Sequence, residues 1–148
     1  MLKFSLDEYL SLSIGLEKHH CLFHHLWNWG RPVFSNETLT AQVSFNSTGE
    51  CINFILNPDF WAKKTFNQKM FIIAHECLHI VLNHGLRIQS CVNKDWAGQT
   101  IDIATNHILI ERFGFIRSEV DPENQLCWVD TVFPILCNLP TDKCFEYY

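Results

Sequence analysis

The sequence predicts an α+β fold in which several helices accompany a small β-sheet. Apolar residues recur at helical spacing in three stretches of the chain, and two short segments after the first stretch look like strands. The chain contains no internal repeat, no low-complexity tract and no linker, and its 148 residues are enough for one hydrophobic core. We therefore expect a single domain that covers residues 1–148.

The first helical stretch covers residues 4–29. Ser5 and Glu8 have the spacing of a capping box, in which two side chains satisfy free backbone N–H groups at the start of a helix. Apolar residues then follow at helical intervals, which predicts one long helix or two short ones. Gly30 and Pro32 are typical helix terminators and should end this region.

Two predicted strands follow, and together they could form a hairpin. Residues 39–46 (LTAQVSFN) alternate apolar and polar side chains, as a half-buried strand does. Residues 47–50 (STGE) supply the small and polar residues of a turn, and residues 51–57 (CINFILN) form the second predicted strand. The pair Asn57–Pro58 is a typical breaker and ends this strand.

The second and third helical stretches lie in the remainder of the chain. Residues 58–85 have a helical period that is broken near residues 65–67 and ends at Gly85. A polar loop over residues 87–99 leads to another helix over residues 100–114, which again ends in glycine. A polar stretch, a short apolar segment and a tail that could form one helical turn complete the chain, at residues 117–125, 126–136 and 139–148.

Composition and charge exclude several classes of function. A hydrophobic content of 47% with 18% charged residues is ordinary for a globular protein. The net charge of −5 argues against nucleic acid as a partner, and we see neither a bilayer-spanning apolar run nor a signal peptide. The seven cysteines form no C-x-x-C pair, so we expect reduced, mostly buried thiols in a cytoplasmic protein that does not bind membranes.

The main candidate for chemistry is the H-E-x-x-H motif formed by His75, Glu76 and His79. On a helix the two histidines lie one turn apart on the same face, so both imidazoles can bind one metal ion. Glu76 then lies where it can take a proton from a water on that ion. The motif interrupts a strongly apolar run, in which uncompensated His and Glu side chains would be costly to bury. We expect one Zn²⁺ per chain at this motif.

Catalytic zinc sites usually have three protein ligands, and two residues compete for the third position. Asp102 and Asn106 lie four residues apart on one face of the next predicted helix. Asp102 can therefore bind the metal while Asn106 holds a ligand histidine by its other ring nitrogen. His84 is the alternative third ligand. On a continuous helix it would point about 140° away from His79, so it could reach the same ion only after a sharp turn.

Two further interpretations concern the third ligand. An acidic residue further along the chain, such as Asp130, could take this position. Asp102 could instead be a charge favoured by the positive end of a helix dipole, with Thr100 as the N-cap. Gly85 follows His84 rather than preceding it, so a turn at this glycine comes too late to redirect the histidine.

The segments INFILNPDFW, FIIAHECLHIVLNHGLR and TIDIATNHIL resemble a zinc metallopeptidase domain. That domain precedes a von Willebrand A-like domain in many bacterial proteins and also occurs alone in bacteria and phages. The resemblance covers nearly the whole chain, although the von Willebrand-like partner domain is absent and Asn83 stands where the family usually has glycine. The residues that match the family's motif are Asn57, Pro58, Phe60, His75, Glu76, His79, His84, Arg87, Asp102 and Asn106.

This resemblance implies a zincin-like fold with an N-terminal helix, a small sheet or hairpin, the H-E-x-x-H helix and a second ligand-bearing helix. The arrangement is also similar to that of the gluzincin peptidases, whose third ligand comes from the second helix. That similarity supports Asp102 over His84 as the third ligand. It also implies that residues 51–57 form the edge strand that receives an extended peptide by strand addition.

The expected function is therefore hydrolysis of peptide bonds in a peptide or protein substrate, with Glu76 as general base. His84, Arg87 or His107 could donate a hydrogen bond to the oxyanion of the transition state. The alternative is a zinc-stabilised protein-binding factor without turnover, for example a phage-encoded one that acts on a host protein. That alternative would have a closed site with His84 as the fourth protein ligand. A metal-free helical interaction domain is a third alternative.

Overall fold

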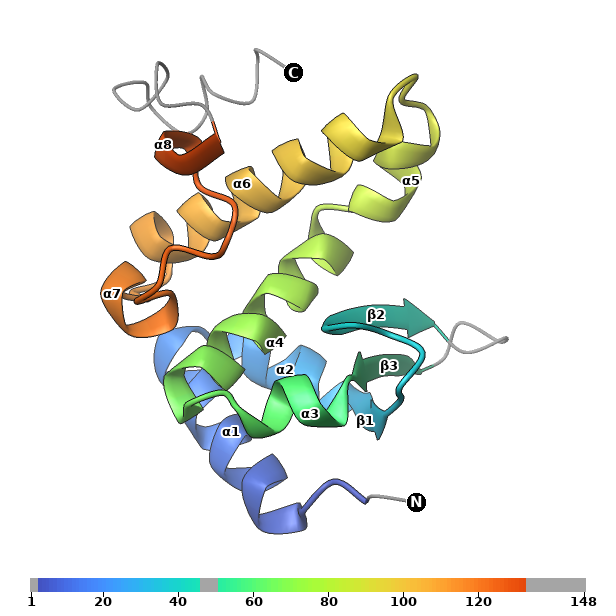
Figure 1. The fold of residues 1–148 in the computed structure, drawn as a ribbon. Coiled ribbons are helices and arrows are strands. Elements are labelled where there is room, and N and C mark those ends of the chain that lie inside the picture. Colours follow the sequence, from blue (N-terminus) through green and yellow to red (C-terminus); the bar gives the residue numbers. More distant parts are fainter. Residues whose placement is uncertain (1–2, 46–50, 133–148) are drawn as a thin grey trace. The chain divides into compact units, whose positions relative to one another are not determined.

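The computed structural model describes residues 3–45 and 51–132. This part of the chain contains eight helices and a three-stranded sheet, which confirms the predicted α+β class (Figure 1). The chain separates into two compact units, Met1–Cys77 and Leu78–Tyr148. The expectation of a single domain over the whole chain stays a prediction.

Two helices open the first unit, α1 (Leu6–His19) and α2 (Cys21–Trp29). The Ser5 hydroxyl accepts a hydrogen bond from the backbone N–H of Glu8 at 3.4 Å, as the predicted cap requires. The chain breaks at His20, whose backbone is extended and whose ring nitrogen accepts an N–H from the first turn of α2. Of the two forms considered for this region, the structure therefore has two short helices.

The sheet consists of β1 (Gly30–Phe34), β2 (Ala41–Phe45) and β3 (Ile52–Leu56), in the order β1-β3-β2. β2 and β3 are antiparallel, which confirms the predicted hairpin, and Val43 of β2 lies opposite Phe54 of β3. The predicted turn between these two strands lies outside the described residues. β1 pairs with the other side of β3 and runs parallel to it.

The strand β1 is not expected from the sequence, which predicts only the end of a helix at Gly30 and Pro32. Glycine is required at the start of β1, because a Cβ on Gly30 would lie 2.2 Å from the ring of Phe54. Proline is tolerated because β1 is an edge strand. Since β1 and β2 flank β3, the expectation that residues 51–57 form the receiving edge is wrong.

Two more helices, α3 (Pro58–Ala62) and α4 (Phe66–Val81), follow the sheet. Asn57 ends the strand region and caps α3, since its Oδ1 accepts the N–H of Phe60 at 2.9 Å. α3 ends at Ala62 and α4 begins at Phe66, which confirms the predicted break near residues 65–67. Buried apolar side chains from α1, α2, β3, α3 and α4 form the core of this unit: Leu12, Leu16, Phe23, Leu26, Trp27, Ile52, Phe54, Leu56, Trp61, Met70, Phe71, Ile73, Ala74 and Cys77.

The second unit contains the end of α4 and four further helices, α5 (His84–Gln89), α6 (Lys94–Arg112), α7 (Arg117–Val120) and α8 (Val129–Val132). α6 is the longest of these helices, and Figure 1 shows α7 and α8 beside it. The predicted tail after residue 138 lies outside the described residues. Buried apolar side chains of this unit are Leu78, Ile101, Ile103, Leu109, Phe115, Val120, Trp128 and Val129.

Two helix boundaries in the second unit differ from the prediction, since α4 ends earlier and α6 begins earlier than expected. α4 ends at Val81 and Gly85 lies inside α5, so the expectation that the motif helix continues to this glycine is wrong. Residues 87–99 are largely helical rather than a loop. The reason is Asn93, whose side chain accepts the N–H of Trp96 at 3.1 Å and starts α6 inside the polar stretch.

Composition led to expectations about membrane-spanning segments and about the burial of the cysteines. Within the part of the chain that the structure describes, no helix is long and apolar enough to cross a bilayer. The thiols are less buried than expected, since Cys21 and Cys91 are exposed and Cys51 and Cys127 are half-buried. Cys77 is fully buried in the core, and this burial raises the pKa of its thiol far above the ordinary value.

Candidate metal centre

The H-E-x-x-H motif lies in the second half of α4. His75, Glu76 and His79 each offer one ligand atom, and these atoms all lie within 4.8 Å of one another. All three residues are half-buried, so solvent retains some access to them. The grouping follows from helix geometry, because the two histidines are one turn apart and the glutamate follows the first of them directly. The predicted motif is thus present on a helix with its ligand atoms close together.

His79 lies between two further polar side chains. Its Nε2 is 3.3 Å from Oδ1 of Asp102 on α6, and its Nδ1 is 2.8 Å from Nδ1 of His84 at the start of α5. His84 is buried, with 3% of its surface exposed, whereas 44% of the Asp102 side chain is exposed. The two ring nitrogens of an imidazole point in different directions, so Asp102 and His84 contact different sides of His79.

A sharp turn brings His84 to His79. Asn83 adopts the left-handed conformation, with φ 55° and ψ 39°. Asparagine is enriched among the non-glycine residues that take this conformation, so it can replace the glycine that such a turn usually requires. The expectation that His84 continues the motif helix is therefore wrong. The turn comes directly before this histidine and places it beside the second histidine of the motif.

Asp102 lies inside α6 rather than at its start. The N-cap of α6 is Asn93. The hydroxyl of Thr100 donates to the carbonyl oxygen of Trp96 at 2.8 Å, which is a bond within the helix and not a cap. The helix dipole acts mainly on the first turn, so it does not explain a carboxylate at Asp102. The interpretation of Asp102 as a charge at a helix N-terminus is wrong.

The separation of His79 and Asp102 is compatible with two ligands of one zinc ion. In a tetrahedral zinc site with bonds of about 2.0–2.1 Å, two ligand atoms are roughly 3.3 Å apart. Nε2 of His79 and Oδ1 of Asp102 have this separation, 3.3 Å. The ligand atoms that all lie within 4.8 Å of one another belong to His75, Glu76 and His79 and not to Asp102, so the joint binding of one ion by His75, His79 and Asp102 stays a prediction. His84 contacts the remaining ring nitrogen of His79, where ligand histidines commonly have a hydrogen-bond partner.

The other predicted site residues lie elsewhere in the second unit. The side-chain amide of Asn106 donates to the carbonyl oxygen of Cys127 at 3.0 Å, and its bond to a ligand histidine stays a prediction. Asp130 pairs with Arg117 at 2.9 Å, which accounts for its charge without a metal. Arg87 lies near the C-terminal end of α5.

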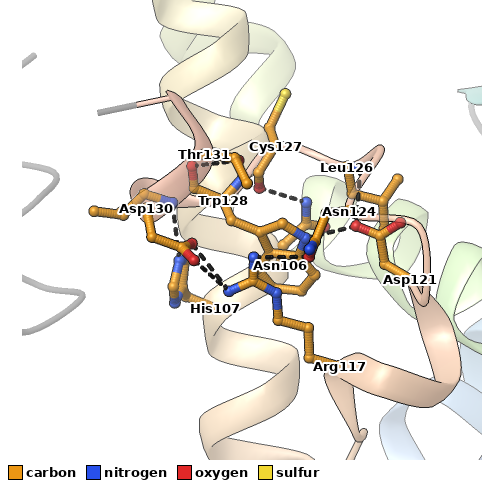
Figure 2. A network of polar contacts seen from close by, with 11 residues as sticks. Asn106, His107, Arg117, Asp121, Asn124, Leu126, Cys127, Trp128, Asp130 and Thr131 are labelled. Atoms are coloured by element: carbon orange, nitrogen blue, oxygen red, sulfur yellow. Dashed lines mark hydrogen bonds and ion pairs between the residues drawn. The ribbon is translucent and has the colours of Figure 1, made fainter. Parts of the chain in front are cut away.

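A buried carboxylate that was not among the predicted site residues organises the segment after α7 (Figure 2). Asp121 is 6% exposed and accepts the backbone N–H groups of Gln125 and Leu126 at 2.9 and 3.0 Å. It also accepts the indole N–H of Trp128 at 2.7 Å. The signal in the sequence was the Asp121–Pro122 pair, which is typical of a turn whose aspartate binds backbone N–H groups further on.

Trp128 is the centre of a second group of contacts, shown in Figure 2. The guanidinium of Arg117 lies 4.5 Å from the centroid of its ring and also forms the ion pair with Asp130. Nε2 of His107 accepts the N–H of Val129 at 3.2 Å. Burial lowers the pKa of His107, and the hydrogen bond from Arg117 lowers the pKa of Asp130. These contacts hold the start of α8 against α6.

Comparison with models of protein families matches residues 15–125 to the family described as "Putative metallopeptidase domain". The chain belongs to this family. The match to the metallopeptidase family covers most of the chain and includes the sheet, the motif helix and all of α6. The resemblance inferred from the motif is thus confirmed. Comparisons with curated proteins and with solved structures give no match.

Proposed function

We propose that this protein is a zinc-dependent metallopeptidase. The observation that supports it most is the position of His79, whose two ring nitrogens face Asp102 and His84. A histidine that served only to pack the core would not need a carboxylate on one side and an imidazole on the other. Metal-binding histidines, in contrast, commonly have such a partner at the nitrogen that does not bind the metal. Membership of a metallopeptidase family supports the same conclusion.

In this proposal His75, His79 and Asp102 hold one zinc ion per chain. Three protein ligands leave one position of a tetrahedral site for water or substrate, as catalytic sites require. When bound, zinc lowers the pKa of a water molecule to about 7 and polarises the carbonyl of the bond to be cleaved. The exposed part of the Asp102 side chain gives substrate a route to this side of the site.

Glu76 performs the proton transfers. Its carboxylate accepts a proton from the attacking water and then passes this proton to the leaving amide nitrogen. The side chain is suited to this role because one of its oxygens lies within 4.8 Å of the ligand atoms of both histidines. It is also half-buried, which limits competition from bulk water.

His84 keeps His79 in the tautomer that metal binding needs. If Nε2 of His79 faces the metal, its proton must be on Nδ1, and this N–H can donate to Nδ1 of His84 at 2.8 Å. A residue on that side of the ring is badly placed to bind the same ion. His84 is therefore proposed as a supporting residue and not as the third or fourth ligand. Arg87, three residues further along α5, is the candidate for the hydrogen bond to the oxyanion.

The substrate in this proposal is a peptide or protein segment that adds to an edge of the sheet. The edges are β1 and β2. Pro32 has no N–H to donate, so β1 offers an incomplete row of backbone groups. β2 is consequently the edge that we propose for strand addition.

Metal content tests the proposed ligand set. We would measure zinc by elemental analysis in the wild type and in Asp102→Ala, His84→Ala and Glu76→Gln. About one zinc per chain is expected in the wild type and in Glu76→Gln, and little in Asp102→Ala, which loses a ligand. His84→Ala should still bind zinc, with an affinity reduced by about 10- to 100-fold. Glu76→Gln should not cleave a peptide that the wild type cleaves.

Asp95→Ala is the matched control, because this aspartate is exposed in the first turn of the same helix and should leave the zinc content unchanged. Complete loss of zinc in both Asp102→Ala and His84→Ala, even at saturating zinc, would indicate a closed structural site. A wild type without zinc after reconstitution would refute the metal site. Full activity of Glu76→Gln would refute the assignment of the general base.

A further inference from the structure

Residues 121–129, which we call the strap, are attached to the part of α6 that carries Asp102. Asn106 is buried and lies one helical turn after Asp102, on the same face of α6. Its side-chain amide donates to the carbonyl oxygen of Cys127 in the strap at 3.0 Å (Figure 2). Cys127 also packs against the buried apolar cluster that contains Ile103, the residue after Asp102. The strap therefore contacts α6 directly beside the proposed ligand.

The side chain of Cys127 and the carboxylate of Asp102 interact electrostatically. Burial and, to a smaller extent, the negative charge of Asp102 raise the pKa of the Cys127 thiol. The same proximity acts on Asp102, because closure of the strap brings uncharged groups towards a carboxylate and removes water from its charge. Removing water from a charge costs free energy. A zinc ion on Asp102 would neutralise this charge and lower the cost of closing the strap.

Further contacts hold the strap closed through residues that are not proposed ligands. Asp121 accepts the backbone N–H groups of Gln125 and Leu126, and Nε2 of His107 accepts that of Val129. The acceptors of these three N–H groups are side chains that lie inside the strap or on α6. Hydrogen exchange at these amides therefore reports how often the strap opens.

We propose that closure of the strap and zinc binding at Asp102 are coupled, so that each strengthens the other, through the position of Asn106 and Cys127 beside this carboxylate. Asn106 and Cys127 are positioning residues in this proposal and not ligands. The coupling is reciprocal, so zinc stabilises the closed strap by the same factor by which the closed strap strengthens zinc binding. Opening of the strap thus weakens the metal centre without changing its ligands. The inference rests on the proposed function, because it requires zinc at Asp102.

Hydrogen exchange followed by NMR tests the effect of zinc on the strap in the full chain. Saturating zinc should slow exchange at the amides of Gln125, Leu126 and Val129 by about fivefold or more. The amide of Phe60, which is bonded in the capped first turn of α3 in the first unit, is the control and should exchange at the same rate with and without zinc. In Asp102→Ala, zinc should no longer slow exchange in the strap.

Variants of the strap contacts test the reverse effect, that of the strap on zinc. Asn106→Ala removes the bond to Cys127, and Asp121→Ala removes the acceptor inside the strap. Each should raise the dissociation constant for zinc by about fivefold or more. Ser5→Ala is the matched control, since it removes the cap of α1 in the first unit and should leave zinc affinity unchanged. Competition with a metal-indicator dye measures the affinities, and circular dichroism checks that each variant is folded.

The outcomes separate the coupling from the proposed function. Zinc that binds at about one ion per chain and leaves exchange in the strap unchanged overturns the coupling and leaves the proposed metal site intact. Equal slowing at Phe60 and in the strap also overturns the coupling, because it indicates general stabilisation. So do folded Asn106→Ala and Asp121→Ala variants with the zinc affinity of the wild type. A chain that binds no zinc overturns both the coupling and the proposed function.

Discussion

His79 shows how far single residues can be interpreted from the sequence. Its pairing with His75, and the place of Glu76 between them, follow from helix periodicity alone and are present as predicted. Its contact with His84 could not be predicted, because it depends on one left-handed residue, Asn83, in a position where a helix would otherwise continue. The presence of an asparagine does not by itself predict that its backbone is left-handed.

We predict that the stability of the chain depends on the single buried carboxylate of Asp121. Replacing this buried carboxylate with alanine leaves two backbone N–H groups and the indole N–H of Trp128 without their acceptor. We expect Asp121→Ala to lower the free energy of unfolding by about 2–4 kcal/mol, and Asp121→Asn to have a smaller effect because one oxygen acceptor stays. Urea unfolding at neutral pH measures both changes.

The control for this measurement is Glu123→Gln, two residues away. Glu123 is exposed, and its side chain accepts a hydrogen bond only from the side chain of Gln125 among the contacts that the structure gives for it. A change of less than about 0.5 kcal/mol is expected. If Asp121→Ala were equally harmless, the buried hydrogen bonds of Asp121 would not stabilise this segment.

At the scale of elements, α6 shows which parts of a helix could be predicted from the sequence and which could not. Its second part and its glycine end were predicted from periodicity, and Gly114 does have a positive φ of 74°. Its first part was missed because the capping Asn93 lies in a polar stretch that resembles a loop. β1 was missed for a similar reason, since Gly30 and Pro32 are helix terminators and also suit an edge strand. Local signals of this kind mark the end of one element without specifying the type of the next.

The packing of α8 on α6 should depend on pH through His107. Burial lowers the pKa of this imidazole below its ordinary value of 6.5, so the unfolded chain binds the proton more readily than the folded one. Neutral His107 therefore makes its full contribution to the free energy of unfolding above pH 6.5. This contribution is lost as the pH falls through 6.5 towards the lower pKa that His107 has in the folded state. Protonated His107 could no longer accept the N–H of Val129.

We expect the free energy of unfolding to fall over this range, and His107→Gln to make the fall shallower because its amide oxygen can accept a hydrogen bond without titrating. Urea unfolding at several pH values provides the measurement. Asp130 acts at lower pH, since its pKa is held below 3.8 by Arg117 and its contribution is lost only as the pH falls below that value. An identical pH profile for wild type and His107→Gln would contradict the role of His107.

At the scale of the whole molecule, the sequence predicted the class of fold and the family better than the connections between elements. The α+β class follows from periodicity, and the family follows from a motif spread over the strand, α4 and α6. Tertiary pairings are different. The order β1-β3-β2, and the contact of His79 with Asp102 on another helix, join residues far apart in the chain. The spacing of Asp102 and Asn106 and the similarity to the gluzincin peptidases both suggested a ligand on α6, and this assignment stays a prediction.

Removal of metal should destabilise the chain if the proposed site is correct. A ligand that binds only the folded state stabilises it by about 2.7 kcal/mol when its free concentration is 100 times its dissociation constant. We therefore expect a chelator to lower the midpoint of urea unfolding relative to protein with excess zinc. Asp102→Ala should show little difference between the two conditions. A wild type with the same midpoint in both would argue against a zinc ion at this site.

The surroundings of Trp128 also make its fluorescence sensitive to the conformation of the α8 segment. Its indole is fully buried, with the cation of Arg117 over the ring and the imidazole of His107 in edge contact, the ring centroids being 5.4 Å apart. Fluorescence emission from a tryptophan depends on the polarity of its environment and on nearby charged imidazole. Opening of the α8 segment would expose this indole to water and shift its emission to the red. Trp128 can thus report whether the segment is closed once the other four tryptophans of the chain are replaced.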